Sequence, residues 1–411
     1  MEPTFLLILL CSLILFNFVF SAILDYINNK NWKNEIPNEL KDFYDTKKYL
    51  KAKDYKKSRG KVSLVSSIIS TSLTLLILAT GIYGYVSDYI YEVYSSPFLH
   101  SAIFFLFFYF INMIISLPVS YYSTFVVEEK FGFNKTSLKT FLIDIVKGTF
   151  MSIIIGGLLL GAAVFLYYYF NEGFWVWLWI GLSLFTIFMS MFYTTLIVPI
   201  FNKLSPLENG TLKDKIQNYS KEIGYSLKNI FIIDGSKRSS KANAYFSGLG
   251  PKKTIALFDT LVEKHTEEEL VAVLAHEVGH YKKNHIKQGM FISVIQIGMM
   301  CYLFELCTKL PELTTALGAE IDAFHLGLIG FSLLFSPIGL IIGIFGNIIS
   351  RKNEFEADDY AKKTYNGESL KLALKKLSVD SLTNLYPHPL YVYIHYSHPP
   401  LLERLKALDS N

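Results

Sequence analysis

Long apolar stretches constrain the fold of this 411-residue chain more than any other feature. Seven of them are long enough to cross a lipid bilayer as a helix, which takes about 20 apolar residues. Only 18% of the residues are charged, against about a quarter in an average soluble protein. The sequence therefore predicts a mainly α-helical, multi-pass membrane protein with seven transmembrane helices. They lie near residues 4–23, 62–86, 98–127, 148–170, 174–200, 288–307 and 323–349.

Three of these stretches carry a further expectation. The sequence begins Met-Glu-Pro-Thr, without Lys or Arg, which is unlike a secretory signal peptide, so we expect a retained span. Pro118 should kink the third stretch or divide it. We expect the sixth stretch to continue the helix of the histidine motif described below, through Lys282, Lys283 and Lys287. That motif would then lie close to the membrane surface or just inside it.

Lysine and arginine are unevenly distributed among the segments that join the spans. Residues 24–61 carry eleven of them, whereas residues 87–97 carry none. Cytoplasmic loops are the ones rich in Lys and Arg, which predicts an N-terminus outside and seven crossings in alternation. The segments expected in the cytoplasm are 24–61, 128–147, 201–287 and 350–411.

The remaining composition adds little about function. A net charge of +4 gives no indication of a nucleic-acid partner, and we expect none. Cys11, Cys301 and Cys307 all lie in apolar runs. They form neither a disulfide framework nor a C-x-x-C metal pair, and we expect them to be small buried hydrophobic residues.

The chain divides into four parts on this pattern. We expect a membrane region at 1–200, a cytoplasmic α/β segment at 201–287, two spans at 288–349 and a cytoplasmic tail at 350–411. Alternating apolar runs in the second part predict strands at 229–234, 243–248 and 254–259. Helical spacing in the tail predicts helices at 351–363, 369–377 and 401–408.

The α/β segment contains the motif His276-Glu277-Val-Gly-His280. Thr266 and Glu269 form an S/T-x-x-E capping box, which predicts that the helix carrying the motif starts there. Residues four apart share one face of a helix, so His276 and His280 can hold one metal ion together. Glu277 projects beside them, where it could take a proton from a metal-bound water. The motif alone also occurs by chance in ordinary amphipathic helices.

Acidic residues just after the last apolar stretch are candidates for a third ligand. Catalytic zinc usually has three protein ligands and one open position. Glu354 and Asp358 are four residues apart and share one helix face, whereas Glu356 points elsewhere. Behind a ligand at Glu354, Asp358 would accept a hydrogen bond from a ligand histidine and so orient it. A solvated helix end has the same composition, and spacing alone does not rank Glu354 above Glu356.

Seven stretches of the chain match a known pattern, and they lie at 117–134, 199–207, 243–246, 257–261, 275–280, 354–358 and 398–404. Together they resemble the type I CAAX prenyl endopeptidase family, which are integral-membrane zinc proteases related to the gluzincins. The resemblance implies that His276, His280 and Glu354 bind one Zn²⁺ per chain, and that Glu277 is the general base. It places Asp358 behind the ligands. The H-E-x-x-H motif is shared with many metalloproteases, and the membrane-side stretches make the match specific.

The same resemblance adds three residues to the site. His398 would stabilise the developing oxyanion, and Arg404 would lie nearby. Asn243 would precede a strand that pairs with the substrate backbone. The family often has a histidine-serine pair just before this strand, whereas this chain has Lys241 and Ala242, which puts side-chain contacts to the substrate there in question.

We therefore expect an integral-membrane zinc endopeptidase that removes the last three residues (aaX) from prenylated CaaX proteins or peptides. The expected partners are these substrates and the lipid bilayer. The site would face the cytoplasm, at the endoplasmic reticulum membrane in a eukaryote or the inner membrane in a bacterium. One alternative is a membrane quality-control metalloprotease of broad specificity. A non-catalytic membrane scaffold or channel is another, against which the intact Glu277 argues.

Overall fold

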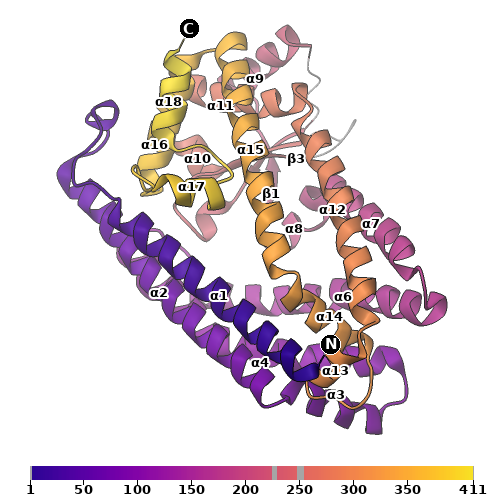
Figure 1. Ribbon diagram of the computed structural model, residues 1–411. Helices are drawn as coiled ribbons and strands as arrows, with labels where there is room; N and C mark the ends of the chain where they lie inside the picture. The colour runs from indigo at the N-terminus through magenta and orange to yellow at the C-terminus, as the bar shows by residue number, and fades with distance from the viewer. Residues whose placement is uncertain (1, 225–228, 248–253, 411) are drawn as a thin grey trace.

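The computed structural model describes residues 2–224, 229–247 and 254–410, most of them in helices (Figure 1). The helices that make up most of the predicted spans are α1 (Pro3–Lys30), α2 (Thr46–Ala79), α3 (Ile82–Val93), α4 (Pro97–Tyr122), α6 (Leu138–Phe170), α7 (Phe174–Leu196), α12 (His285–Thr308), α14 (Phe324–Leu334) and α15 (Ser336–Thr364). The others are α5 (Glu129–Phe131), α8 (Val198–Phe201), α9 (Thr211–Glu222), α10 (Asp259–Lys264), α11 (Glu267–Lys282), α13 (Pro311–Ala316), α16 (Gly367–Asp380), α17 (Pro389–His395) and α18 (Leu401–Asp409).

Six of the described helices are long and apolar enough to cross a membrane, and there are seven spans if α14 and α15 count as one. These two helices meet at an angle of 55°. Pro337 lies in the first turn of α15 and lacks the N–H that would continue the hydrogen bonds of α14, which accounts for the break. The prediction of a mainly helical, multi-pass membrane protein is confirmed.

Two predicted spans differ in detail from the structure. The stretch 62–86 is not one helix, because Gly81 adopts a left-handed backbone (φ 67°) between α2 and α3. Such a conformation suits glycine, which has no Cβ. Pro118 does not divide the third span, since α4 continues through it. The irregular part follows later, where residues 123–128 form a π-helix before α5.

The expected continuity between the motif helix and the sixth span is wrong. Helix α11 ends at Lys282, and α12 begins at His285. Asn284 between them has a left-handed backbone with φ 61°, which Asn tolerates better than most residues. The chain therefore turns sharply after the motif before it enters the span.

The α/β segment forms a four-stranded sheet in the order β1-β2-β4-β3. Strands β2 and β4 are parallel, and the outer pairs are antiparallel. Three strands confirm the predicted runs, while β1 was not predicted, and Gly248 lies outside the described residues. Alternate residues of β4 face opposite sides: Ile255 and Leu257 pack on α11, whereas Ala256 packs with Ile233. The strands are β1 (Leu204–Pro206), β2 (Asn229–Ile233), β3 (Ala244–Ser247) and β4 (Thr254–Phe258).

The lysine-rich segments lie together at one end of the molecule. Tyr49 and Tyr55, from the 24–61 segment, share a buried cluster with Phe131 and with Leu382 of the tail. Lys241, from the α/β segment, donates to the Tyr55 hydroxyl at 2.6 Å. These contacts agree with the predicted alternation of the segments across the membrane.

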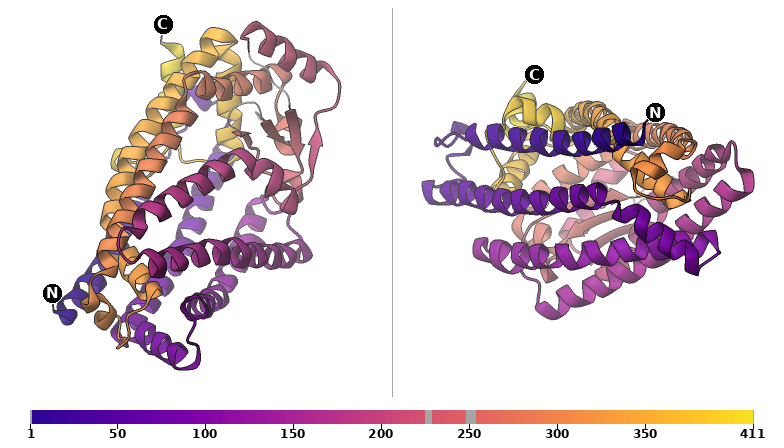
Figure 2. Two further views of the ribbon diagram at one scale, coloured as in Figure 1. Left: turned by 90° about the vertical axis from the view of Figure 1, so that its right-hand side faces the viewer. Right: turned by 60° about the horizontal axis from the view of Figure 1, so that its bottom comes forward.

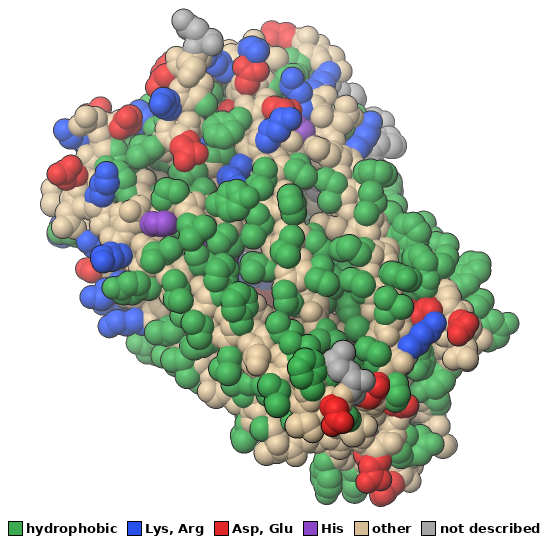
Figure 3. Space-filling view, in the orientation of Figure 1, with side chains coloured by type: hydrophobic (Ala, Val, Ile, Leu, Met, Phe, Trp, Pro, Cys, Tyr) green, Lys and Arg blue, Asp and Glu red, His purple; other side chains and the backbone are tan. Residues whose placement is uncertain are grey.

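The surface divides into an apolar middle and charged ends. Hydrophobic side chains cover the middle of the face seen in Figure 3, over the span helices, whereas charged side chains of both signs gather over the C-terminal helices at the top and mainly Asp and Glu lie at the bottom. In two views α12 and α15 run alongside each other from the α/β end into the span region (Figures 1 and 2). Both helices therefore join the buried α11 to the membrane part.

Candidate metal centre

Helix α11 holds the histidine motif rigidly. The predicted capping box is present: the Thr266 hydroxyl accepts from the Glu269 N–H at 3.3 Å, and the Glu269 carboxylate accepts from the Thr266 N–H at 3.3 Å. Lys376 of α16 donates to the same carboxylate at 2.6 Å. All residues from Glu269 to His276 are buried. Packing on several sides leaves the helix little freedom to move.

Three side chains of the predicted site converge. The Nε2 atoms of His276 and His280 lie 3.2 Å apart. The carboxylate of Glu354, which α15 brings to the motif, has Oε2 at 3.4 Å from His276 Nε2 and Oε1 at 3.2 Å from His280 Nε2. Their ligand atoms all lie within 4.8 Å of one another, and they form a group that could hold a metal ion.

These distances fit a metal ion at the centre of the group. Ligands that bind at about 2.0–2.1 Å in a tetrahedron stand roughly 3.3–3.4 Å from one another, close to the separations seen here. Glu354 Oε2 is buried and makes no hydrogen bond to any described residue; its nearest partners, His276 and Arg404, lie at 3.4 Å. A cation would give this buried oxygen the partner that it lacks.

Asp358 and Arg404 support this arrangement from behind. Asp358 Oδ1 lies 2.8 Å from His276 Nδ1, so Nδ1 carries the hydrogen and Nε2 points at Glu354 and His280. Burial favours the neutral imidazole, but the adjacent carboxylates of Asp358 and Glu354 outweigh it and raise the pKa of His276 to about 9. Arg404 donates to both oxygens of Asp358, at 2.8 and 2.6 Å. The guanidinium thus fixes the carboxylate that orients His276.

Glu277 and His398 lie next to the three convergent residues. Glu277 is half-buried and lines a cavity of about 420 Å³ together with His280, between α11, α12 and α15. His398, in the loop before α18, has Nε2 at 3.3 Å from Glu354 Oε1, and its side chain is 64% exposed. Glu277 therefore borders a cavity next to His280, and His398 is open to solvent beside Glu354.

Asn243 makes no contact with the three convergent residues in the part of the chain that the structure describes. It is exposed, its Oδ1 accepts from the Ala244 N–H at 2.9 Å, and its carbonyl accepts from the Phe258 N–H at 3.1 Å. Strand β3, which follows it, is at the edge of the sheet. Lys241 points away to Glu128 at 3.0 Å.

The structure adds two residues that sequence reasoning did not place. His285 packs on His280, with the two Nδ1 atoms 3.0 Å apart, and its Nε2 lies 3.1 Å from Glu356 Oε2. The two acidic residues that spacing could not rank therefore differ in place: Glu354 faces both motif histidines and Glu356 faces His285. Asn284 was the sequence signal for the turn that brings His285 onto His280, because Asn adopts a left-handed backbone more readily than most residues.

Comparisons with known proteins cover nearly all of the chain. Residues 25–203 match a family model described as CAAX prenyl protease N-terminal, five membrane helices, and residues 206–411 match peptidase family M48. The chain is 34% identical to a CAAX prenyl protease 1 homolog of Dictyostelium discoideum, over 97% of this chain and 95% of that one. It is 32% identical to CAAX prenyl protease 1 of Saccharomyces cerevisiae, over 95% and 92%.

A solved structure gives the same relationship. The crystal structure of S. mikatae Ste24p is similar over 98% of this chain and 99% of that one, with a TM-score of 0.92 and 32% sequence identity. Both the membrane part and the α/β part are included in that overlap. The chain therefore belongs to the CAAX prenyl protease 1 family and is a multi-pass membrane metalloendopeptidase of peptidase family M48.

Proposed function

We propose that this protein is a zinc-dependent endopeptidase that removes the last three residues from prenylated CaaX proteins or peptides. The observation that carries the proposal is the convergence of His276, His280 and Glu354 within 4.8 Å, with Glu277 beside them. Two imidazoles and one carboxylate are a ligand set typical of catalytic zinc, which keeps one position open. The names of the full-length relatives support the CaaX substrate.

The side chains around the centre have distinct roles in this proposal. Zinc held there would polarise the scissile carbonyl and acidify water. Glu277 takes a proton from the attacking water and passes it to the leaving amine. His398, exposed and 3.3 Å from Glu354, donates to the oxygen that becomes negatively charged. Asp358 keeps the Nδ1 proton of His276 in place, so that its Nε2 lone pair stays directed at the metal position.

The edge of the sheet is the proposed place for the substrate backbone. Strand β3 is hydrogen-bonded along one side to β4 and is last in the sheet order. An extended peptide can add to such an edge by main-chain hydrogen bonds. Asn243, exposed at the start of β3, would contact that peptide.

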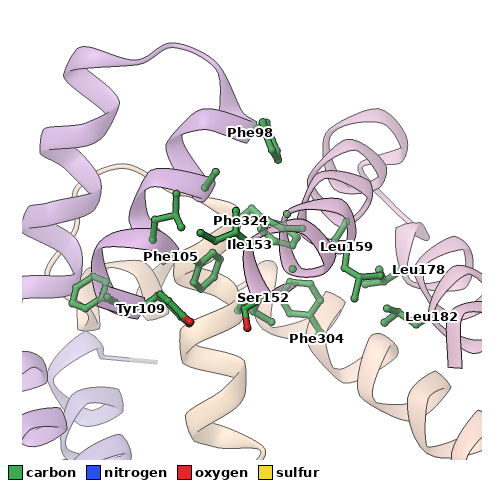
Figure 4. A pocket seen from close by; sticks show the side chains of 18 of the residues that line it. Phe98, Phe105, Tyr109, Ser152, Ile153, Leu159, Leu178, Leu182, Phe304 and Phe324 are labelled. Atoms are coloured by element: carbon green, nitrogen blue, oxygen red, sulfur yellow. The ribbon is translucent and has the colours of Figure 1, made fainter. Parts of the chain in front are cut away.

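The lipid group of the substrate would enter the membrane part. Helices α4, α6, α7, α12 and α14 enclose a cavity of about 880 Å³, into which apolar side chains such as Phe105, Phe304 and Phe324 point (Figure 4). On α12, Gln296 lines the cavity at the metal centre and Met300 lines the apolar one. Four residues of helix span about 6 Å and lie on one face. A lipid attached beside the scissile bond can therefore follow α12 into apolar surroundings.

The cytoplasmic orientation of the site is also part of the proposal. The lysine-rich segments gather at the end of the molecule that holds the metal centre, and cytoplasmic loops carry such an excess. The membrane would be the endoplasmic reticulum in a eukaryote and the inner membrane in a bacterium.

Steady-state kinetics on three matched peptides test the proposed function. A farnesylated CaaX peptide is compared with its free-thiol and short-alkyl analogues, and Glu277→Gln serves as the blank. We expect a much higher kcat/KM for the farnesylated peptide, because burial of apolar area contributes about 25 cal/mol per Å². Equal kcat/KM for all three would reject prenyl specificity and favour a quality-control protease.

A further inference from the structure

We propose that His285 and Glu356 form a positioning chain that orients His280 and strengthens its hold on the metal. The inference rests on the proposed metal site and concerns residues outside the ligand set. His280 Nδ1 lies 3.0 Å from His285 Nδ1, and His285 Nε2 lies 3.1 Å from Glu356 Oε2. Two hydrogen bonds in series therefore link the Glu356 carboxylate to His280.

The directions of these hydrogen bonds follow from the chemistry of the partners. Glu356, as a carboxylate, only accepts, so His285 Nε2 carries a hydrogen and donates it. The neutral imidazole of His285 then has a lone pair at Nδ1, which accepts the Nδ1 hydrogen of His280. His280 Nε2 is left with its lone pair toward Glu354, 3.2 Å away. One tautomer of each ring satisfies both hydrogen bonds of the chain and leaves the Nε2 lone pair of His280 for a metal ion.

The turn after the motif places His285. Asn284, with φ 61°, separates α11 from α12, and the first residue of α12 packs on His280. The His285 side chain is 6% exposed, while that of Glu356 is 38% exposed. A buried imidazole with a partner at each nitrogen is held in one orientation, and it transmits that orientation to His280.

The arrangement matches the support of the other histidine. Asp358 contacts His276 Nδ1 directly, at 2.8 Å, whereas Glu356 acts on His280 through His285. Carboxylates that receive the outer N–H of a metal-bound imidazole fix the ring and raise its basicity. Helix α15 would thus supply one ligand, Glu354, and a carboxylate behind each of the two histidines.

Metal retention tests this proposal independently of peptide cleavage. The dissociation constant of Zn²⁺ is measured by competition with a chelator, and Co²⁺-substituted protein gives a visible spectrum that responds to ligand geometry. Glu356→Ala and His285→Leu are expected to weaken binding by about 10- to 100-fold and to shift the Co²⁺ bands. His285→Gln is expected to restore part of the affinity, because an amide both accepts and donates.

Two controls separate the chain from surface charge. Lys352→Ala removes the other partner of Glu356, which lies at 3.7 Å, and Asp359→Ala removes an exposed carboxylate of the same helix that pairs with Lys363. Neither residue contacts His285 among the described residues, and both variants should keep wild-type affinity.

The proposal is overturned if Glu356→Ala binds Zn²⁺ within twofold of wild type, or if Asp359→Ala weakens binding equally. A double variant Glu356→Ala/His285→Leu would also contradict the proposal if its loss of binding free energy equals the sum of the two single losses. Residues that act in one chain are coupled, so their effects should not add. These outcomes are distinct from failure of the proposed function, in which wild-type protein binds zinc but does not cleave the farnesylated peptide.

Discussion

Arg404 and Asp358 face each other as a two-pronged ion pair, with Arg404 Nε 2.8 Å from Oδ2 and Nη2 2.6 Å from Oδ1. Their side chains are 11% and 2% exposed. The Asp358 Oδ1 atom also lies 2.8 Å from His276 Nδ1. The C-terminal helix α18 is therefore joined to the candidate metal centre through Asp358 and also through Glu354, whose Oε2 lies 3.4 Å from Arg404 Nη1.

Loss of this ion pair should cost both stability and metal. In Arg404→Ala, Asp358 would be left buried without its charged partner, which costs about 3–5 kcal/mol. We expect a lower free energy of unfolding in detergent and weaker retention of zinc. Lys406→Ala, an exposed residue of the same helix, is the control. Equal stability of the two variants would show that the pair does not hold α18 in place.

Substitution of the general base and substitution of a metal ligand should differ in their effects on zinc content and turnover. Glu277→Gln should keep about one zinc per chain and lower kcat by about 10²- to 10⁴-fold, because only proton transfer is removed. His276→Ala or Glu354→Ala should lose both metal and turnover, since two ligands hold zinc poorly. Metal analysis of purified proteins checks this. Full zinc content in Glu354→Ala would exclude Glu354 as the third ligand.

Metal affinity should fall in acid. The pKa of His276 in the metal-free chain is raised to about 9, since the adjacent carboxylates of Asp358 and Glu354 outweigh burial. Below that pH a metal ion must displace one proton from His276, so apparent affinity should fall about tenfold for each pH unit. Above it the dependence should flatten. Chelator competition across pH 6–10 measures the slope, and a flat profile below pH 9 would show that His276 binds no proton that competes.

The topology can be checked by labelling single cysteines. Asn209 is exposed in the segment before α9. In a background that lacks Cys11, Cys301 and Cys307, an Asn209→Cys variant should react with an impermeant thiol reagent only from the cytoplasmic side. Labelling in intact cells, without permeabilisation, would contradict the proposed orientation of the site.

The apolar cavity should discriminate lipid substrates. Gly156 lines it, and a Cβ placed there meets no atom within 4 Å, so Gly156→Phe fills the cavity without disturbing α6. We expect kcat/KM for the farnesylated peptide to fall about 10- to 100-fold, as roughly two to three CH₂ groups lose about 0.8 kcal/mol each. The short-alkyl peptide should be unaffected.

Gly181 offers a matched control for that variant. It is exposed on α7, has equally open surroundings and does not line the cavity. A fall in kcat/KM of the same size in Gly181→Phe, or no fall in Gly156→Phe, would place the lipid elsewhere.

The sequence by itself determined the features that depend on local spacing. Long apolar runs predicted the spans because the bilayer sets their length. The Thr266 and Glu269 capping box predicted the start of α11, and the spacing of His276 and His280 predicted their shared face. These features involve residues within a few turns of one another, so that helix geometry alone relates them.

The tertiary structure decided which distant side chains meet. Spacing could not separate Glu354 from Glu356, because the choice depends on how α15 packs against α11, more than 70 residues earlier. The turn at Asn284 was missed, although Asn tolerates a left-handed backbone better than most residues. It brings His285 onto His280, and the packing of α18 brings Arg404 onto Asp358. The sequence shows which side chains could bind a metal or form ion pairs, whereas long-range packing decides which of them contact one another.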